Sequence, residues 1–253
     1  GSVLFEGDFD NVPVIQAATV GVSGIFLNLW PTPEPDDQVR QAQTFINAAK
    51  AGSSSIVVST AFLTAQPELW AGVAGLKPYY TGKAAVEDAV RQASLPSYTI
   101  LRPSFLMHNY FMPDSQYHFP ELFTEGILAH AYQKGRRMPH LDAADVGKFA
   151  AEALLSPDTF NGHELELGFQ NLTPEEATDT LRRVSGRNIQ VHARSDAEIA
   201  SKGDHLPTLP FHILANEQDL TINGELLQKT YGITMMKFHD FLHTERGELL
   251  RSL

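Results

Sequence analysis

Two side chains four residues apart, Tyr79 and Lys83, are the first candidates for chemistry in this sequence. They lie in a run from Pro78 to Glu87 that predicts a helix. In a helix, positions i and i+4 share one face, so both side chains could point into one cleft. A neighbouring ammonium favours the phenolate form of a tyrosine, and a phenol tuned in this way can exchange a proton with a substrate oxygen. The spacing alone also fits a Tyr79 that covers the core and a Lys83 that is an exposed charge.

The composition sets limits on the class of protein. The chain has 253 residues, of which 43% are apolar, enough for one large domain or one and a half. No apolar run approaches the roughly 18 residues that cross a bilayer, and no signal-peptide pattern is present, so we expect a soluble, cytoplasmic protein. The absence of Cys excludes disulfides, thiolate catalysis and Cys-based zinc sites. A formal net charge of −11 argues against a nucleic-acid partner.

In the first part of the chain, apolar strands alternate with amphipathic helices. This order predicts a parallel sheet with helices on both faces, which is an α/β, doubly wound fold. The predicted strands are 3–10 (a short strand that runs into a Gly-Asp turn), 25–29, 55–60 and 98–101, and the predicted helices are 12–20, 39–51 and 79–93.

The pattern changes after Arg102 and Pro103. Residues 105–123 are rich in aromatic residues, His, Met and Pro without a clear period, and they fit either the lining of an apolar pocket or irregular core. Thr173, followed by Pro174 and by Glu176 three positions after the cap, predicts a strong helix start. Further predicted elements are a helix over 142–155, strands over 164–167 and 189–192, and helical turns over 196–201 and 225–230.

These segments, taken in order, resemble the NmrA-like family of atypical short-chain dehydrogenases/reductases. The resemblance runs from residue 3 to about residue 195 and is looser beyond that point. The matching pieces are Glu6–Asp10, Ile25–Leu29 before a Pro-rich loop, Val57–Thr60, Lys83–Glu87, Tyr98–Asn109, Asp145–Gly147, Leu172–Glu176 and Arg183–Asn188.

The resemblance implies a Rossmann-like sheet that binds NAD(P), with NADP favoured, and a small α+β substrate region near the C-terminus. Residues 1–145 would form the cofactor-binding part, and residues 146–253 a smaller substrate-binding part interleaved with the sheet. Some members of the family are reductases or isomerases of quinones, phenolic compounds and secondary metabolites. Others have lost the catalytic Tyr and sense the redox state of the nicotinamide cofactor.

The family's cofactor loop, Gly-x-x-Gly-x-x-Gly between the first strand and the first helix, is absent here. The sequence begins where the third strand of the family begins, so we expect an N-terminally truncated chain whose sheet lacks its first βαβ unit. The strand at 25–29 would then be an unpaired, apolar edge. Cofactor binding by this chain should be weak or nil, because the pyrophosphate loses the loop and the helix N-terminus. The alternative is a naturally short protein that re-pairs its strands or completes its sheet with a partner chain.

The resemblance also assigns roles to individual residues. Lys83 would hold the ribose hydroxyls of the nicotinamide nucleotide, Tyr79 would donate the proton, and Ser59 or Thr60 would bind the substrate oxygen, although a hydroxyl that caps a strand end fits Ser59 and Thr60 equally well. The remaining assignments are Asp8, Asn28 and Leu29 near the adenosine (with a turn-forming Asp8 and a satisfied polar Asn28 as alternatives), Pro103 and Phe105 beside the nicotinamide, and Phe105, Asn109 and Tyr110 at the substrate. Glu87 is expected to be only a helix partner of Lys83 or Arg91.

Three functions remain open. The first is an NAD(P)H-dependent oxidoreductase that reduces a quinone, an enone or a similar apolar carbonyl. The second is an NADP(H)-sensing regulator without turnover, with a protein partner or a second copy of the chain. The third is a non-redox cyclase or isomerase of secondary metabolism. A metal site is not expected, because the pair His239 and His243 lacks a third ligand.

Overall fold

The computed structural model describes residues 2–32, 34–202 and 206–253. Contacts divide the chain into two compact units, one of Gly1–Pro103 with Val146–Glu166 and the other of Ser104–Asp145 with Leu167–Leu253. Each unit therefore takes two separate segments of the chain. The expected division into a cofactor part (1–145) and a substrate part (146–253) concerns function and stays a prediction. In the described residues, no helix has both the length and the apolar character that crossing a bilayer requires.

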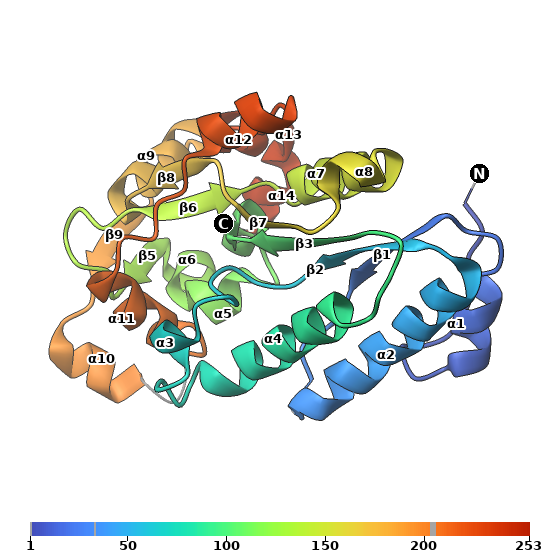
Figure 1. Cartoon of the computed structure of the whole chain (residues 1–253). Helices are drawn as coiled ribbons and strands as arrows, with labels where there is room; N and C mark the ends of the chain where they lie inside the picture. Colours follow the sequence, from blue (N-terminus) through green and yellow to red (C-terminus); the bar gives the residue numbers. More distant parts are fainter. Residues whose placement is uncertain (1, 33, 203–205) are drawn as a thin grey trace. The chain divides into compact units, whose positions relative to one another are not determined.

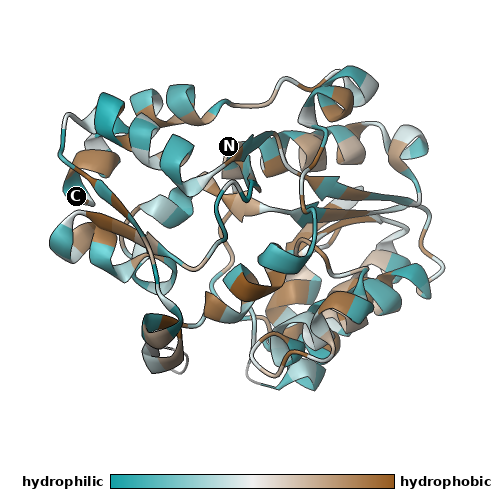
Figure 2. Ribbon diagram, turned by 90° about the vertical axis from the view of Figure 1, so that its left-hand side faces the viewer, coloured by the Kyte–Doolittle hydropathy of each residue, from teal (hydrophilic) through white to brown (hydrophobic). Residues whose placement is uncertain are grey.

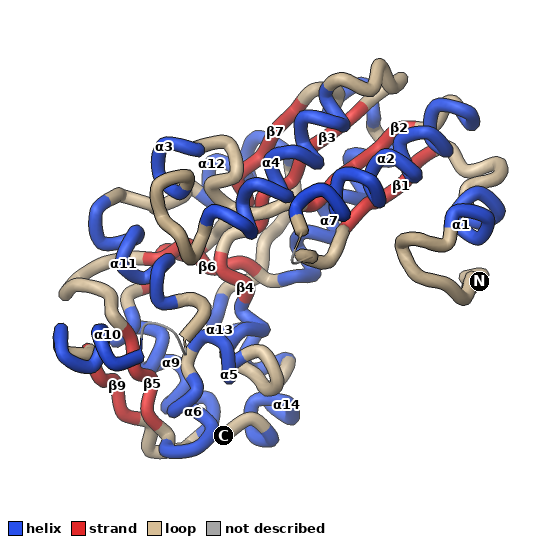
Figure 3. Tube along the Cα trace, turned by 90° about the horizontal axis from the view of Figure 1, so that it is seen from below, coloured by secondary structure: helices blue, strands red, loops and turns tan. Residues whose placement is uncertain are grey.

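The first unit is built on a four-stranded sheet with the order β1-β2-β3-β7, and Figure 3 shows these strands side by side. The β1–β2 and β2–β3 pairs are parallel, with Ile25 opposite Ile56 and Val58 opposite Ile100. The strands are β1 (Gly24–Asn28), β2 (Ser55–Ser59), β3 (Tyr98–Pro103) and β7 (His163–Leu167).

Helices cover both faces of this sheet (Figure 1). α2 and α4 pack against each other on one side, where Ile46 and Val86 join the strand residues in one apolar core. α7 and α8 lie on the other side (Figure 1). The doubly wound α/β prediction is confirmed. The helices are α1 (Val12–Ala18), α2 (Pro35–Gly52), α3 (Pro67–Trp70), α4 (Lys77–Arg91), α7 (Ala143–Leu155) and α8 (Pro157–Phe160).

The predicted strand over residues 3–10 is wrong. Residues 2–8 form no helix or strand, and a turn follows at 9–10. A strand is stable only beside another strand, and the described residues offer this segment none. β1 forms the edge of the sheet as predicted, with Phe26 exposed. The missing first βαβ unit stays a prediction.

The second unit holds two smaller sheets, with the orders β4-β6-β8 and β5-β9. β6 pairs parallel with β4 and antiparallel with β8, and β5 pairs parallel with β9. The strands are β4 (Phe105–Leu106), β5 (Ile127–His130), β6 (Met138–Leu141), β8 (Gln170–Leu172) and β9 (Gln190–Ala193).

The helices of the second unit are mostly short and surround a core that is rich in aromatic side chains, among them Phe119 and Phe241. In Figure 2 many helices show both colours, as expected when one face meets a core and the other meets water. The helices are a 3-10 turn (Met107–Tyr110), α5 (Ser115–His118), α6 (Pro120–Glu125), α9 (Pro174–Ser185), α10 (Asp196–Lys202), α11 (Leu209–Glu217), α12 (Gly224–Tyr231), α13 (Phe238–Thr244) and α14 (Arg246–Arg251).

The start of α9 carries the capping box that the sequence predicts. The Thr173 hydroxyl accepts a hydrogen bond from the Glu176 backbone N–H, and the Glu176 carboxylate accepts one from the Thr173 N–H. We expect Thr173→Ala to lower the free energy of unfolding by about 1 kcal/mol, because the cap is lost. Urea unfolding followed by circular dichroism measures this, with Thr244→Ala, an exposed helical threonine, as the control. Equal stability of Thr173→Ala and the wild type would contradict the assignment.

Candidate functional site

Lys83 is buried in the first unit and points toward the carboxyl end of β1, the edge strand of the sheet. Only 4% of it is exposed, and its Nζ donates a hydrogen bond of 2.8 Å to the backbone oxygen of Leu29, the residue after β1. Ligands of open α/β sheets bind at the carboxyl ends of the strands, and Leu29 lies at such an end. Burial lowers the pKa of Lys83 to about 8. The alternative of an exposed Lys83 is wrong.

Tyr79 lies on the same face of α4 as Lys83, one turn earlier. The Lys83 Nζ lies 5.8 Å from the centroid of the Tyr79 ring, which is close enough for a cation–π contact. Tyr79 is 38% exposed, so it does not simply cover core, but the loss of water around it still raises its pKa to about 12. The ammonium thus faces the ring and the Leu29 carbonyl, and the phenol is less acidic than in water.

The two hydroxyls at the end of β2 differ in their surroundings. Ser59 and Thr60 are both buried, and the Thr60 Oγ1 donates a hydrogen bond of 2.7 Å to Glu87 Oε1. The hydroxyl hydrogen of Thr60 is therefore already used in a hydrogen bond to a buried carboxylate. Its expected role toward a substrate oxygen stays a prediction, as does that of Ser59.

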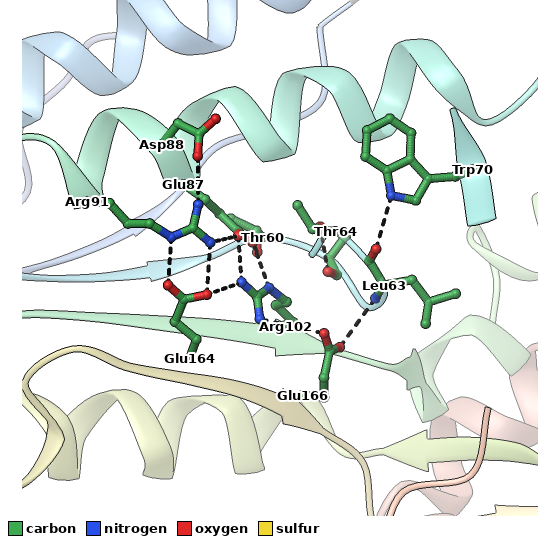
Figure 4. A network of polar contacts seen from close by, with 11 residues as sticks. Thr60, Leu63, Thr64, Trp70, Glu87, Asp88, Arg91, Arg102, Glu164 and Glu166 are labelled. Carbon is green, nitrogen blue, oxygen red and sulfur yellow. Dashed lines mark hydrogen bonds and ion pairs between the residues drawn. The ribbon is translucent and has the colours of Figure 1, made fainter. Parts of the chain in front are cut away.

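Glu87 on α4 is the centre of a buried ion cluster that also takes side chains from β3 and β7 (Figure 4). Arg102 donates to its two oxygens through Nε (2.9 Å) and Nη2 (2.7 Å), and Arg91 donates through Nη2 (2.7 Å). Arg102 and Arg91 also both bond Glu164. The contact of Glu87 with Arg91 agrees with the sequence analysis, but the bond to buried Arg102 makes Glu87 much more than a helix partner.

Two carboxyl groups of β7 respond in opposite ways to this cluster. Hydrogen bonds from Arg91 lower the pKa of Glu164 to about 2, against the opposing effect of burial. Burial raises the pKa of Glu166 to about 7, because its contact with Arg102 is long, at 3.7 Å, and compensates little. Glu166 thus changes its charge near neutral pH.

The other cofactor residues predicted in the first unit are spread out. Asn28 ends β1 on its exposed side, and Leu29 next to it is buried. The Pro103 backbone oxygen accepts a hydrogen bond from Phe62, in the loop after β2. Asp8 follows no strand, contrary to expectation, and its carboxylate accepts a hydrogen bond of 3.0 Å from the Asp10 N–H. This is the turn-forming arrangement that was the alternative for Asp8, since its predicted strand does not form.

The predicted substrate residues Phe105, Asn109 and Tyr110 lie in the second unit. The Phe105 ring packs edge-on against Tyr110, and the Tyr110 hydroxyl lies 2.8 Å from His140 Nε2. Met138 accepts the His140 Nδ1–H, so the Tyr110 hydroxyl donates to Nε2. The cavity beside these rings has a volume of about 10 Å³, enough for roughly one water molecule. The segment 105–123 therefore forms irregular core here, and its role toward a substrate stays a prediction.

A larger groove, of about 1130 Å³, crosses the surface of the second unit. It runs along β8 and α9. Its lining includes both basic residues (Arg137, Arg183 and Lys237) and acidic residues (Glu176 and Asp179). No residue that the sequence analysis assigns to a site lines it. Its mixed charges give no clear preference for a ligand.

Sequence reasoning missed Arg102, Glu164 and Glu166 as members of one cluster. A signal was present: Arg102 closes an otherwise apolar strand, and the two glutamates alternate with leucines along a strand, which places them on one face. Charged side chains are almost never fully buried without partners. The partners could have been sought on neighbouring strand ends and on α4.

The geometry fits part of a dinucleotide site. An ammonium has three N–H donors, and the bond to Leu29 uses one of them. The others suit a pair of vicinal hydroxyls such as those of a ribose. The described residues contain no glycine-rich turn between a strand and a helix that could hold a pyrophosphate.

This chain belongs to the NmrA-like family, whose profile matches residues 1–216. Among characterised proteins it is similar to the agroclavine dehydrogenase of Claviceps fusiformis, with 33% identity over 107 residues, which are 42% of this chain and 36% of the enzyme. The matches to curated relatives span between 36% and 59% of the length of those proteins.

Solved structures share the fold. The negative transcriptional regulator NmrA in complex with NADP superposes with a TM-score of 0.73 at 18% identity, over 99% of this chain and 83% of that one. The NADPH-dependent quinone oxidoreductase of Escherichia coli in complex with NADPH gives a TM-score of 0.71 at 20% identity, over 94% and 82%. Identities this low establish the Rossmann-type fold alone.

Proposed function

We propose that this chain is the NAD(P)-binding part of an oxidoreductase that reduces a quinone, an enone or a similar apolar carbonyl. One observation carries the proposal: the buried Lys83 lies at the carboxyl end of the parallel strand β1, and its ammonium has N–H donors beyond the one bonded to Leu29. Burying a lysine costs free energy, so buried lysines are rare and are often found at functional sites. Membership of the NmrA-like family and similarity to dehydrogenases support the same conclusion.

In this proposal the chain's own residues bind and orient. Lys83 donates to the ribose hydroxyls of the nicotinamide nucleotide, and Tyr79 on the same helix face donates a proton to the substrate oxygen. Bound NAD(P)H supplies the hydride. We favour NADP over NAD, and we expect weak affinity, because the described part of the chain contains no glycine-rich loop for the pyrophosphate.

The role of Tyr79 is tested by removing its hydroxyl. If Tyr79 is the proton donor, Tyr79→Phe should lower kcat for quinone reduction by roughly 100-fold or more while NADPH affinity stays the same. Tyr98→Phe, which removes a phenol at the first residue of β3, is the control. Turnover is measured as NADPH oxidation with a panel of quinones, near saturating NADPH. Full activity of Tyr79→Phe would rule out this proton donor.

The second candidate is an NADP(H) sensor without turnover, and the environment of Tyr79 favours it. The loss of water around the Tyr79 phenol raises its pKa to about 12, and the Lys83 ammonium donates its hydrogen bond to Leu29 rather than to the phenol. A sensor would bind NADPH, as measured by calorimetry, but would oxidise none of it with any quinone. It would also co-purify with a regulatory partner.

A further inference from the structure

The loop after β2 is strained and is fixed at one residue. Leu63 has a φ of +67°, a left-handed conformation that a branched side chain disfavours. Its N–H donates to Glu166 Oε2 at 3.3 Å, and its oxygen accepts a hydrogen bond of 3.0 Å from Trp70 Nε1 (Figure 4). Strained backbone persists only where its surroundings hold it, and here Glu166 and Trp70 hold both polar groups of one residue.

Trp70 connects this loop to the candidate site. Its ring stacks on Tyr80, with centroids 5.4 Å apart and planes 18° apart. Tyr80 meets Tyr79 edge-on at 5.1 Å, and the Tyr79 ring lies 5.8 Å from the Lys83 ammonium. An unbroken series of contacts therefore leads from the Glu166 carboxylate to Lys83.

The charge of Glu166 matters for the first contact in this series. A carboxylate accepts a hydrogen bond from an N–H more strongly than a neutral carboxyl does. The groups that face Glu166 are Arg102 on β3, Glu87 on α4, Glu164 on β7 and the Tyr80 phenol. Arg102 is already bonded to Glu87 and Glu164, so it neutralises Glu166 only in part. Burial raises the pKa of Glu166 to about 7, so the tether changes strength near neutral pH.

We propose that Glu166 is a positioning residue of the candidate site: its carboxylate tethers the strained loop at Leu63 and, through Trp70, holds the Tyr80 and Tyr79 rings beside Lys83. The proposal rests on the proposed function only in treating Tyr79 and Lys83 as the site. Glu166 itself contacts Leu63 and Arg102 and is not a catalytic group.

Trp70 provides a direct readout. The chain has two tryptophans, and Trp30 is 77% exposed whereas Trp70 is 5% exposed. In a Trp30→Phe background, emission reports Trp70 alone. We expect its wavelength and intensity to change with pH, with a midpoint near 7. Glu166→Gln in the same background should abolish the transition, because the amide still accepts the Leu63 N–H but does not titrate.

Glu164→Gln is the matched control. Glu164 lies two residues earlier on the same strand and shares Arg102, but its carboxylate bonds Arg91 and Arg102, whereas the Leu63 N–H donates to Glu166. Its fluorescence transition should therefore remain, and far-UV circular dichroism confirms that each variant is folded. A transition that persists in Glu166→Gln, or that is absent in the Trp30→Phe parent, overturns the proposal. The same proteins are also titrated with NADPH. If they do not bind it, the proposed function is contradicted. The role of Glu166 is decided by the fluorescence in either case.

Discussion

Glu87→Ala is expected to lower the free energy of unfolding by about 3–5 kcal/mol, because it leaves a buried charge without its main partner. Glu87 is 1% exposed and accepts hydrogen bonds from Thr60, Arg102 and Arg91. Arg102, itself 4% exposed, would keep Glu164 but lose both bonds to Glu87. Such losses are large because the guanidinium stays ionised in a place where water cannot replace the carboxylate.

The neighbouring residue provides the control. Asp88 also pairs with Arg91, at 2.7 Å, but its side chain is 62% exposed. Surface ion pairs contribute little, so Asp88→Ala should cost about 0–1 kcal/mol. Both variants are measured by urea unfolding followed by circular dichroism at pH 7. If the two substitutions cost the same, the cluster around Glu87 is not the stabilising centre that the geometry indicates.

Lys83→Met is expected to weaken binding while it stabilises the fold. NADPH affinity should fall at least about 10-fold with the loss of one charged donor pair, which corresponds to about 1.4 kcal/mol. Burial moves the pKa of Lys83 from 10.5 to about 8, a penalty on the charged form of at most about 3 kcal/mol at neutral pH. The substitution removes this penalty but also loses the hydrogen bond to Leu29, which contributes about 1 kcal/mol. Lys83→Met should therefore be more stable than the wild type by about 1–2 kcal/mol at pH 7.

The pH dependence of stability separately tests whether the burial of Lys83 destabilises the fold. Between pH 8 and 10.5 the folded protein has released the Lys83 proton while the unfolded chain still holds it. The unfolded state then binds more protons, so the contribution of Lys83 makes the wild type more stable as the pH rises through this window. Lys83→Met should lack this rise, and Lys77→Met, an exposed lysine at the start of α4, should keep it. If the free energies of unfolding of the wild type and Lys83→Met differ by the same amount at every pH, the burial of a charged lysine is contradicted.

Strong local signals in the sequence were enough for most of the first unit and for the start of α9 in the second unit. The i, i+4 spacing of Tyr79 and Lys83 placed both on one face of α4, and the Thr173 cap with Glu176 located the start of α9. These predictions succeeded because each depends on residues within one or two turns. The strand over 3–10 failed because its formation depends on a neighbouring strand, which the local sequence cannot report.

The ion cluster illustrates the same limit at the site. Glu87 and Arg102 are 15 residues apart, and Arg102 and Glu164 are 62 apart, so only the sheet order brings them together. The short strands β5 and β6 escaped prediction as well, since sequences such as Met-Pro-His-Leu have neither alternation nor a β-branched run. The aromatic segment 105–123 allowed a pocket or a core equally, and only packing could decide between them.

The central claim is that the Lys83 ammonium holds the ribose of a nicotinamide nucleotide at the carboxyl end of β1. A crystal structure of the chain grown with excess NADP tests this most directly. The account predicts the nicotinamide ribose hydroxyls within hydrogen-bonding distance of the Lys83 Nζ, with Leu29 still its backbone partner. A nucleotide bound at another surface, with Lys83 bonded to protein groups only, would contradict it.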